Sequence, residues 1–351
     1  MEKKSGQLGV QSVSYAEPVY ILGAAAVGGT KEEAGPLGEC FDLIAADDKF
    51  GAKTWEAAES AFQQNALRIA LDKANRKEHE IRYLLSGDLL GQSMASNFGT
   101  ANFQIPMLGL YGACSTCGEA LSIGSMLIAG GHADRVACVT SSHFASAEKE
   151  FRYPLDYGTQ RPLSASWTVS GSGAFILGKE KEGNVLAGIA GVTPGKVVDY
   201  GIKDSMYMGA CMAPAAADTI ALHLLDFGRK PEDYDRIITG DLGAVGKMAL
   251  LHLLSKKGFD ISKQHMDCGM EIYGENTDTE SNSACGQDSH AGGSGCGCAA
   301  SVLATLILPK LQTKEWKRVL FVPTGALLSK TSFNEGNTVP GVAHGVVIEA
   351  V

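Results

Sequence analysis

Hydrophobic positions along the chain fall into short continuous apolar runs and longer stretches with helical spacing. The short runs end in Gly, Asp or Ser turns and are typical of buried strands, whereas the longer stretches predict helices. The clearest helix covers residues 54–76, where Thr54 can cap the first turn and apolar residues repeat at helical spacing from Ala58 to Ile69. We predict further helices at 113–131, 213–228, 245–258 and 293–311, and strands at 19–29, 81–89, 135–142, 167–178 (or a hairpin there), 185–192, 236–242, 318–326 and 342–350.

Two pairs of matching segments indicate an internal duplication. LLSGDL at 84–89 matches IITGDL at 237–242, 153 residues later. RVACVTSS at 135–142 matches RVLFVPTG at 318–325, 183 residues later. The difference of 30 residues falls at 259–288, which we interpret as an inserted loop. Chance similarity between apolar strands is the alternative, but two matches in the same order favour duplication.

The alternation of strands and helices predicts an α/β fold with a largely parallel sheet covered by helices. Residues 1–16 are polar, and we expect them to form a flexible tail. The remainder divides into an N-terminal half at 17–183 and a C-terminal half at 184–351.

Composition narrows the class of protein. The chain has 351 residues, 45% of them hydrophobic and 20% charged, which excludes general disorder. Its net charge of −9 argues against a nucleic-acid partner, because such proteins usually carry a basic face. No apolar run approaches the roughly 18 residues of a membrane helix, and the first residues lack the apolar core of a secretory signal. Nine cysteines, an odd number, predict reduced thiols in a cytosol-like compartment.

Cys114 is the candidate nucleophile, because it lies where a loop enters a predicted helix. Unpaired N–H groups and the helix dipole can lower the pKa of a thiol at that position. A buried structural cysteine is the alternative. Cys114 and Cys117 form a CxxC pair, and Cys296 and Cys298 a CxC pair, but both pairs begin small-residue helices where cysteine serves close packing. We therefore expect no metal site.

Glycine-rich segments do not indicate nucleotide chemistry. GSGCG lacks the Lys-Ser/Thr of a phosphate-binding loop, and GAAAVGG does not fit a dinucleotide-binding fingerprint. His290 instead precedes a run in which the amides of Gly292 and Gly293 could form an anion-binding nest. A loop histidine whose neighbouring glycines serve only turn geometry is the equal alternative.

Two acidic residues end matching strands. Asp241 follows one predicted strand and Asp88 the equivalent strand of the first half. Ligand sites form at the carboxyl ends of parallel strands, although an Asp in this position also caps a following helix. His143 and Arg152 follow the strand at 135–142 and could reach a site beside Cys114, although such residues more often lie on a solvated surface.

Taken together, these segments resemble the thiolase superfamily, which includes the ketoacyl synthases. Ala113-Cys114-Ser-Thr-Cys-Gly-Glu is similar to the nucleophile segment, His290-Ala-Gly-Gly293 to the His-x-x-Gly segment, and Trp167–Gly178 to the glycine-rich strand closing the first half. The resemblance implies a duplicated βαβαβαββ fold with five αβαβα layers and two central helices, and it places Cys114 at the nucleophile position.

One position departs from the ketoacyl synthase pattern. Those enzymes carry a histidine after the strand that here ends in Asp241. An ionised carboxylate cannot donate a hydrogen bond to a developing enolate, and it raises the pKa of a nearby thiol. We therefore expect the condensing reaction to be lost and the pocket to remain.

Two phrases, YGACSTCGEALSIGSMLIAGGHADRV and DSHAGGSGCGCAASVLATLILP, resemble a sporulation branch of the superfamily more closely. That resemblance implies a non-catalytic protein that binds dipicolinic acid, with or without calcium, in the system that moves it into the forespore. We then expect a peripheral place at the spore inner membrane, other proteins of that system as partners, and a homodimer. No resident cofactor is expected, only calcium carried in with the ligand.

Under this interpretation Cys114, Asp241, His290, Gly292, Gly293, His143 and Arg152 would form the ligand site. Calcium should strengthen binding, and Asp241→Asn should weaken that dependence. Two alternatives stay open. One is an active acyltransferase that uses Cys114 as acyl acceptor, and the other is a scaffold for membrane proteins with a vestigial pocket.

Overall fold

The computed structural model describes residues 6–152, 160–181, 183–277 and 282–351. Its main sheet places the strands in the order β11–β10–β13–β16–β9–β2–β8–β6–β4–β5. The N-terminal strands are β2 (Ser12–Gly28), β4 (Tyr83–Gly87), β5 (Met107–Leu110), β6 (Arg135–Ser142) and β8 (Gly171–Gly178). Their C-terminal counterparts are β9 (Ala187–Thr193), β10 (Arg236–Thr239), β11 (His265–Asp267), β13 (Arg318–Val322) and β16 (Gly345–Glu349).

The strand order confirms the duplication. β4 and β10, which carry the first matching pair of segments, occupy the same position in their halves, as do β6 and β13 with the second pair. The halves join where β2 pairs antiparallel with β9. Within each half four strands run in one direction and one strand, β8 or β16, runs against them, so the expected largely parallel arrangement holds for the direction of the strands in each half.

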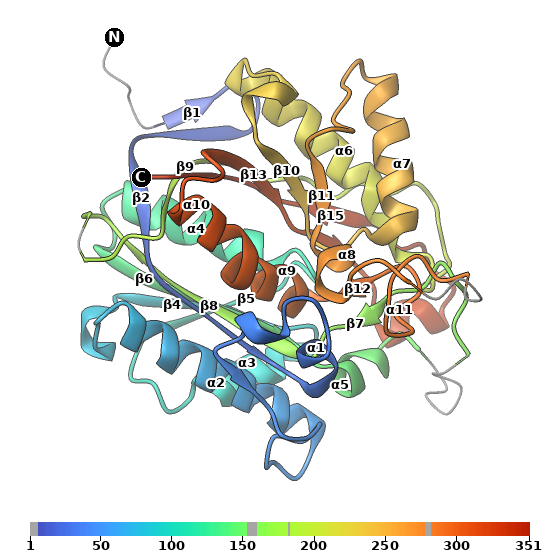
Figure 1. Cartoon of the computed structure of the whole chain (residues 1–351), viewed down its shortest axis with the longest axis horizontal. Helices are drawn as coiled ribbons and strands as arrows, with labels where there is room; N and C mark the ends of the chain where they lie inside the picture. Colours follow the sequence, from blue (N-terminus) through green and yellow to red (C-terminus); the bar gives the residue numbers. More distant parts are fainter. Residues whose placement is uncertain (1–5, 153–159, 182, 278–281) are drawn as a thin grey trace.

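Helices and the two halves of the sheet form five layers, as Figure 1 shows. The middle layer holds α4 (Thr116–Ala129) and α9 (Cys296–Val302), which continues through a π-helical turn (Leu303–Ile307) into α10 (Leu308–Gln312). α2 (Trp55–Lys73) and α3 (Met94–Thr100) cover the N-terminal half, and α6 (Met208–Phe227) and α7 (Gly243–Lys256) the C-terminal half. This arrangement confirms the thiolase-like fold with two central helices.

Small side chains allow the middle layer to lie between two half-sheets. Gly118 of α4 is one example, because a Cβ atom there would lie 3.1 Å from the carbonyl oxygen of His344. The outer helix α2 begins as predicted, with the Thr54 hydroxyl accepting a hydrogen bond from the amide of Ala57 at 3.2 Å. α6 is long and apolar enough to cross a membrane, but 78% of its most apolar window is buried within the fold, as in the core helix of a globular protein.

Three expectations about loops need correction. The tail is ordered from Gly6, because β1 (Gly6–Leu8) pairs with β2 and the Asp226 carboxylate accepts the amides of Val10 and Ser12. The predicted insertion at 259–288 contains β11 and α8 (Cys268–Tyr273). The segment at 167–178 is not a hairpin, because β7 (Trp167–Thr168) pairs in parallel with β12 (Gly293–Ser294) before β8 begins.

The remaining helices and strands are short. They are α1 (Thr30–Glu33), α5 (Phe144–Glu148), α11 (Lys330–Asn334), β3 (Leu43–Ile44), β14 (Thr324–Ala326) and β15 (Gly341–Ala343). The division at residues 183 and 184 stays a prediction.

Candidate functional site

Cys114 lies in a tight turn immediately before α4. Ala113 has a positive φ of 50°, unusual for a residue with a Cβ atom. The turn is fixed by two side chains, because the Ser115 hydroxyl donates to the Gly112 carbonyl and the Thr116 hydroxyl to the Ala113 carbonyl, both at 2.6 Å. The Cys114 side chain is buried, and the turn holds its thiol in one orientation.

Asp241 lies against this thiol. It follows β10 and is buried. Its Oδ1 accepts the Thr324 hydroxyl at 2.6 Å, and its Oδ2 accepts the Gly295 amide at 3.0 Å. The Asp241 carboxyl also lies close enough to the thiol of Cys114 to influence its pKa. Two segments that are distant in sequence therefore supply donors to one carboxyl group.

Burial and charge together suppress ionisation of the thiol. Desolvation raises the pKa of Cys114 well above its ordinary value, and the negative charge of Asp241 raises it further. Burial also raises the pKa of Asp241 to about 7, although its hydrogen bonds to Thr324 and Gly295 oppose the shift. Cys114 is thus a neutral thiol at physiological pH, and the start of α4 does not make it a thiolate.

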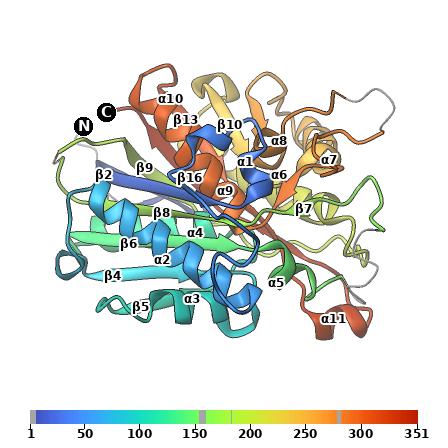
Figure 2. The same ribbon diagram turned by 60° about the horizontal axis from the view of Figure 1, so that its bottom comes forward.

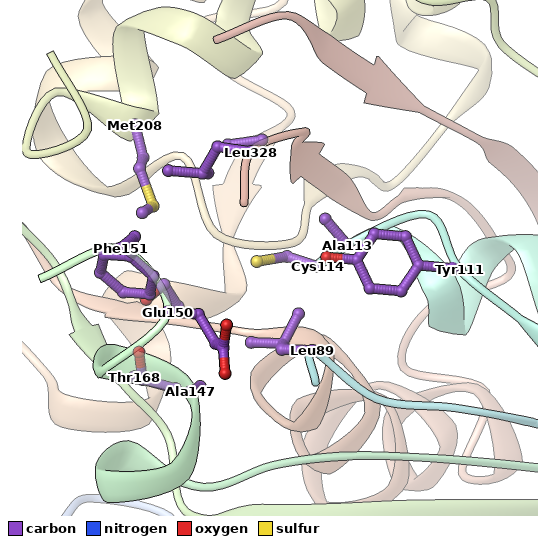
Figure 3. A pocket seen from close by; sticks show the side chains of 12 residues that line it. Leu89, Tyr111, Ala113, Cys114, Ala147, Glu150, Phe151, Thr168, Met208 and Leu328 are labelled. Carbon is purple, nitrogen blue, oxygen red and sulfur yellow. The ribbon is translucent and has the colours of Figure 1, made fainter. Parts of the chain in front are cut away.

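A pocket of about 420 Å³, counting its open mouth, lies in front of Cys114. Figure 3 shows the Cys114 sulfur and the Glu150 carboxylate pointing into this space. No Lys, Arg or His side chain is among the described residues that line it. Most of the lining is apolar, and the complete set is Leu89, Tyr111, Ala113, Cys114, Ala147, Glu150, Phe151, Thr168, Met208, Ser294, Ala326 and Leu328.

His290 and the predicted glycine nest lie elsewhere. The His290 ring contacts the Pro162 carbonyl and the Asp288 carboxylate, each at 3.0 Å. The Gly292 amide donates to the Ser289 carbonyl, and Gly293 belongs to β12. None of the three is among the described residues that line the pocket, and their polar groups have partners within the loop and the β12–β7 ribbon, so their role in binding a ligand stays a prediction. The amide that faces the site is that of Gly295.

His143 and Arg152 also have structural partners. The Nδ1 atom of His143 accepts the Ala145 amide at 3.2 Å and caps α5, while its Nε2 atom contacts the Asp48 carbonyl at 2.7 Å. Arg152 pairs with the Glu148 carboxylate, and both side chains are buried. Neither residue is among the described residues that line the pocket, and their expected role as ligand contacts stays a prediction.

The cysteine pairs do not assemble a metal site. The Cys296 thiol contacts the Ser141 carbonyl and the Cys298 thiol the Gly240 carbonyl, so the two point to different neighbours. In the ranges that the structure describes, no group of three or more His, Cys, Asp and Glu side chains is placed to hold a metal ion.

Sequence reasoning missed several residues of the site. Thr324 and Gly295 bind Asp241 from β14 and from the residue before α9. The only signal for Gly295 was its place in a glycine-rich run at a helix start. Glu150, Phe151 and Met208 come from loops and a helix end that carry no motif.

Comparison with known proteins supports the resemblance. The family model for stage V sporulation protein AD (SpoVAD) matches residues 9–349. Stage V sporulation protein AD of Bacillus subtilis (strain 168) is 41% identical over 341 residues, which cover 97% of each chain.

Similar solved structures show the fold. One is 3-oxoacyl-[acyl-carrier-protein] synthase III from Aquifex aeolicus VF5, with 14% identity, a TM-score of 0.54, and coverage of 94% of this chain and 99% of that one. Another is human mitochondrial 3-ketoacyl-CoA thiolase in complex with CoA, with 14% identity, a TM-score of 0.55, and coverage of 95% and 98%. With its thiolase-like fold and its match over nearly the whole length, the chain belongs to the stage V sporulation protein AD family.

Proposed function

We propose that this sporulation protein holds dipicolinic acid in the pocket beside Cys114 without turning it over. The observation that carries the proposal is the burial of the Cys114 thiol near the Asp241 carboxyl, whose two oxygens already accept the Gly295 amide and the Thr324 hydroxyl. An acyl-transfer site needs a thiolate and free donors for a developing oxyanion. Here the thiol is neutral, and Asp241 already accepts the nearby Gly295 amide and the Thr324 hydroxyl.

The lining of the pocket favours a flat ligand of low net charge. Its walls are mostly apolar, and the acidic side chain that faces it is Glu150. A bare dianion would meet this carboxylate with no cation among the described lining residues. A one-to-one calcium complex of dipicolinate is neutral, and calcium prefers several oxygen ligands. Glu150 can supply one of them.

Asp241 is less suited to calcium than the sequence suggested. Both of its oxygens already accept hydrogen bonds, and it lies behind Cys114 rather than among the lining residues. We therefore propose that calcium dependence resides in Glu150. The role of Asp241 is to keep the thiol protonated.

The test is calorimetric titration of the protein with dipicolinate, with and without calcium. We expect calcium to strengthen binding about tenfold or more, which is about 1.4 kcal/mol. Glu150→Gln should remove most of this gain. The matched control is Glu180→Gln, because Glu180 follows the carboxyl end of β8 and does not line the pocket, and this variant should keep the gain. Cys114→Trp should abolish binding by filling the pocket. Equal affinities with and without calcium, or full binding by Cys114→Trp, would contradict the proposal.

We also propose that two copies associate along β5. This strand ends the main sheet and has one unpaired edge, which can pair with a second strand. Large hydrophobic side chains are exposed on β5, on neighbouring α3 and directly after β5, namely Leu108, Met94, Phe98 and Tyr111. Leu108→Glu should convert a dimer to a monomer in light scattering at micromolar concentration. Other proteins of the transport system would then hold the dimer at the spore inner membrane.

An acyltransferase that uses Cys114 is the alternative. The turn at Ala113 and the position of Cys114 at the start of a central helix favour it, since that geometry suits a nucleophile.

A further inference from the structure

A second cluster of charged residues lies over Trp167 of β7, and Lys31 and Arg161, which form it, are not among the described residues that line the pocket at Cys114. Two cations approach one aromatic ring there. The Lys31 ammonium lies 4.2 Å from the centre of the Trp167 ring, and the Arg161 guanidinium lies 4.6 Å from it. Phe144 stacks on the same ring at 3.9 Å. Like charges this close are unfavourable unless an anion accompanies them.

Arg161 is incompletely paired. Its side chain is only 1% exposed, yet its Nε and Nη1 atoms have no hydrogen-bond partner in the described part of the chain. Only Nη2 is used, with the carbonyl oxygen of Asp288 at 2.6 Å and its carboxylate at 3.0 Å. A buried guanidinium normally has its donors satisfied, and its planar fork fits a carboxylate with two parallel hydrogen bonds. The Nε and Nη1 donors of Arg161 are therefore available to bind a carboxylate.

The nearby acidic groups do not balance the two cations. Asp288 is the carboxylate that pairs with Arg161, and its side chain is 75% exposed and shared with His290. Glu32 is buried, and its Oε1 accepts the Tyr273 hydroxyl at 2.6 Å. Burial raises the pKa of Glu32, which favours its neutral form. Glu148 also acts on Arg161, but it is buried and pairs with Arg152. Asp288 is thus the exposed carboxylate beside Lys31 and Arg161, and a second anion would be favourable there.

The loop that carries Asp288 is strained. Gln287, Asp288 and His290 have positive φ angles of 55°, 54° and 56°, although none is glycine. Strain of this kind persists only where surrounding contacts hold it, and it concentrates at ligand clamps and switch regions. Lys31 helps to hold the loop by donating to the Gln287 carbonyl. Figures 1 and 2 both place α1, which carries Lys31, beside α8 and β7.

We propose that Arg161 and Lys31, over Trp167, form a second binding site for a small carboxylate, at which Asp288 is a displaceable internal stand-in. An arriving carboxylate would replace the Asp288 side chain at Nη2 and also accept from Nη1. The loop Gln287–His290 would move outward and lose its strained conformation. This site goes beyond the proposed pocket, and it binds the bare anion, whereas the pocket takes the calcium complex.

The site has a connection to the pocket through the chain itself. Trp167 precedes Thr168, and the strained loop leads into Ser294, and both Thr168 and Ser294 line the pocket. A carboxylate bound at Arg161 would therefore affect the part of the pocket wall that Thr168 and Ser294 form.

The probe is isophthalate, a planar dicarboxylate that lacks the ring nitrogen with which dipicolinate chelates calcium. Calorimetry in buffer freed of divalent cations should show binding to the full chain. Arg161→Lys should weaken it about tenfold, because lysine cannot form the two parallel hydrogen bonds. Asp288→Asn should strengthen it about threefold or more by removing the internal competitor. Arg236→Lys, whose guanidinium lies over Trp316 instead, is the matched control and should bind as the wild type does.

A second readout keeps the test independent of folding defects in the Arg161 variant. With Trp55 and Trp316 replaced by Phe, Trp167 is the remaining tryptophan of the chain's three. Its emission should change on addition of isophthalate. Cys114→Trp should leave isophthalate binding by calorimetry intact while abolishing binding of calcium dipicolinate, which separates this site from the pocket. Absence of binding, binding unaffected by Asp288→Asn, or binding lost in Cys114→Trp would each overturn the second site.

Discussion

Asp88 and Asp241 follow equivalent strands of the two halves, within the matching segments LLSGDL and IITGDL, but they bind different partners. Asp88 accepts from residues close to it in sequence. Its Oδ1 takes the Leu90 amide at 2.8 Å, and its Oδ2 takes the amide and hydroxyl of Ser96 at 2.8 and 2.6 Å. Asp241 accepts from Gly295 and Thr324, 54 and 83 residues away.

The different partners of Asp88 and Asp241 show that the two halves use equivalent aspartates in different ways. In the N-terminal half the aspartate holds the loop between β4 and α3 and is a structural cap. In the C-terminal half the same residue type binds Gly295, before a central helix, and Thr324, and its charge acts on Cys114. The duplicated fold thus has an aspartate at both positions, and the contacts of Asp241 with residues distant in sequence give it a different role from that of Asp88.

Substitution by asparagine should separate the two aspartates most strongly in stability. Both Asp88 oxygens accept backbone amides, so an asparagine there must turn its NH₂ group toward one of them. A buried unpaired N–H costs about 1–3 kcal/mol, and we expect Asp88→Asn to lower the free energy of unfolding by about 3 kcal/mol. Asp241→Asn should cost less than about 1 kcal/mol, because the Thr324 hydroxyl can reverse and accept. Urea unfolding measures both, and equal losses would refute the assigned difference.

The pH dependence of stability should also distinguish Asp241. Its folded-state pKa of about 7 lies above its usual 3.8, so the folded protein binds more protons over this interval. The stability that this group contributes is therefore present below about pH 4 and is lost as the pH rises toward 7. Asp241→Asn cannot titrate, so it should gain about 2 kcal/mol relative to the wild type between about pH 5 and pH 8. A difference that does not change with pH would exclude a buried, titrating Asp241.

Thiol reactivity gives a third and smaller contrast. Removing the charge of Asp241 should lower the pKa of Cys114 and increase its thiolate fraction about tenfold for each unit of pKa. Alkylation by iodoacetamide, followed by peptide mass spectrometry, should be faster at Cys114 in Asp241→Asn. The exposed Cys40 provides an internal control within the same chain. An unchanged rate at Cys114 would mean that Asp241 does not govern the thiol.

Much of the fold could be predicted from the sequence because the relevant signals are local. Helix α2 shows its capping threonine and its apolar spacing, and the matching strand segments reveal the duplication. The predictions of a flexible tail at residues 1–16 and of an inserted loop at 259–288 were wrong for the same reason. The order of these segments depends on distant partners, such as the Asp226 carboxylate that holds the amides of Val10 and Ser12.

The site was less accessible to sequence reasoning. Cys114 and Asp241 stood out because each follows a recognisable boundary of a helix or strand. The roles of His290, His143 and Arg152 depended on side-chain direction, which local sequence does not encode. In the folded chain each of these side chains contacts a nearby carbonyl or carboxylate and is not among the described residues that line the pocket. Glu150 carried no signal at all, since only the folded chain brings it opposite Cys114.

We propose that Cys114 no longer acts as a nucleophile because burial, together with the charge of Asp241, keeps its thiol neutral. The most direct measurement is the intact mass of the purified chain after incubation with acetyl-coenzyme A, in the wild type and in Cys114→Ala. We expect no acetyl adduct and no release of coenzyme A above the level of Cys114→Ala. A stable adduct mapped to Cys114, or turnover that requires it, would show that Cys114 is an active nucleophile and favour the acyltransferase.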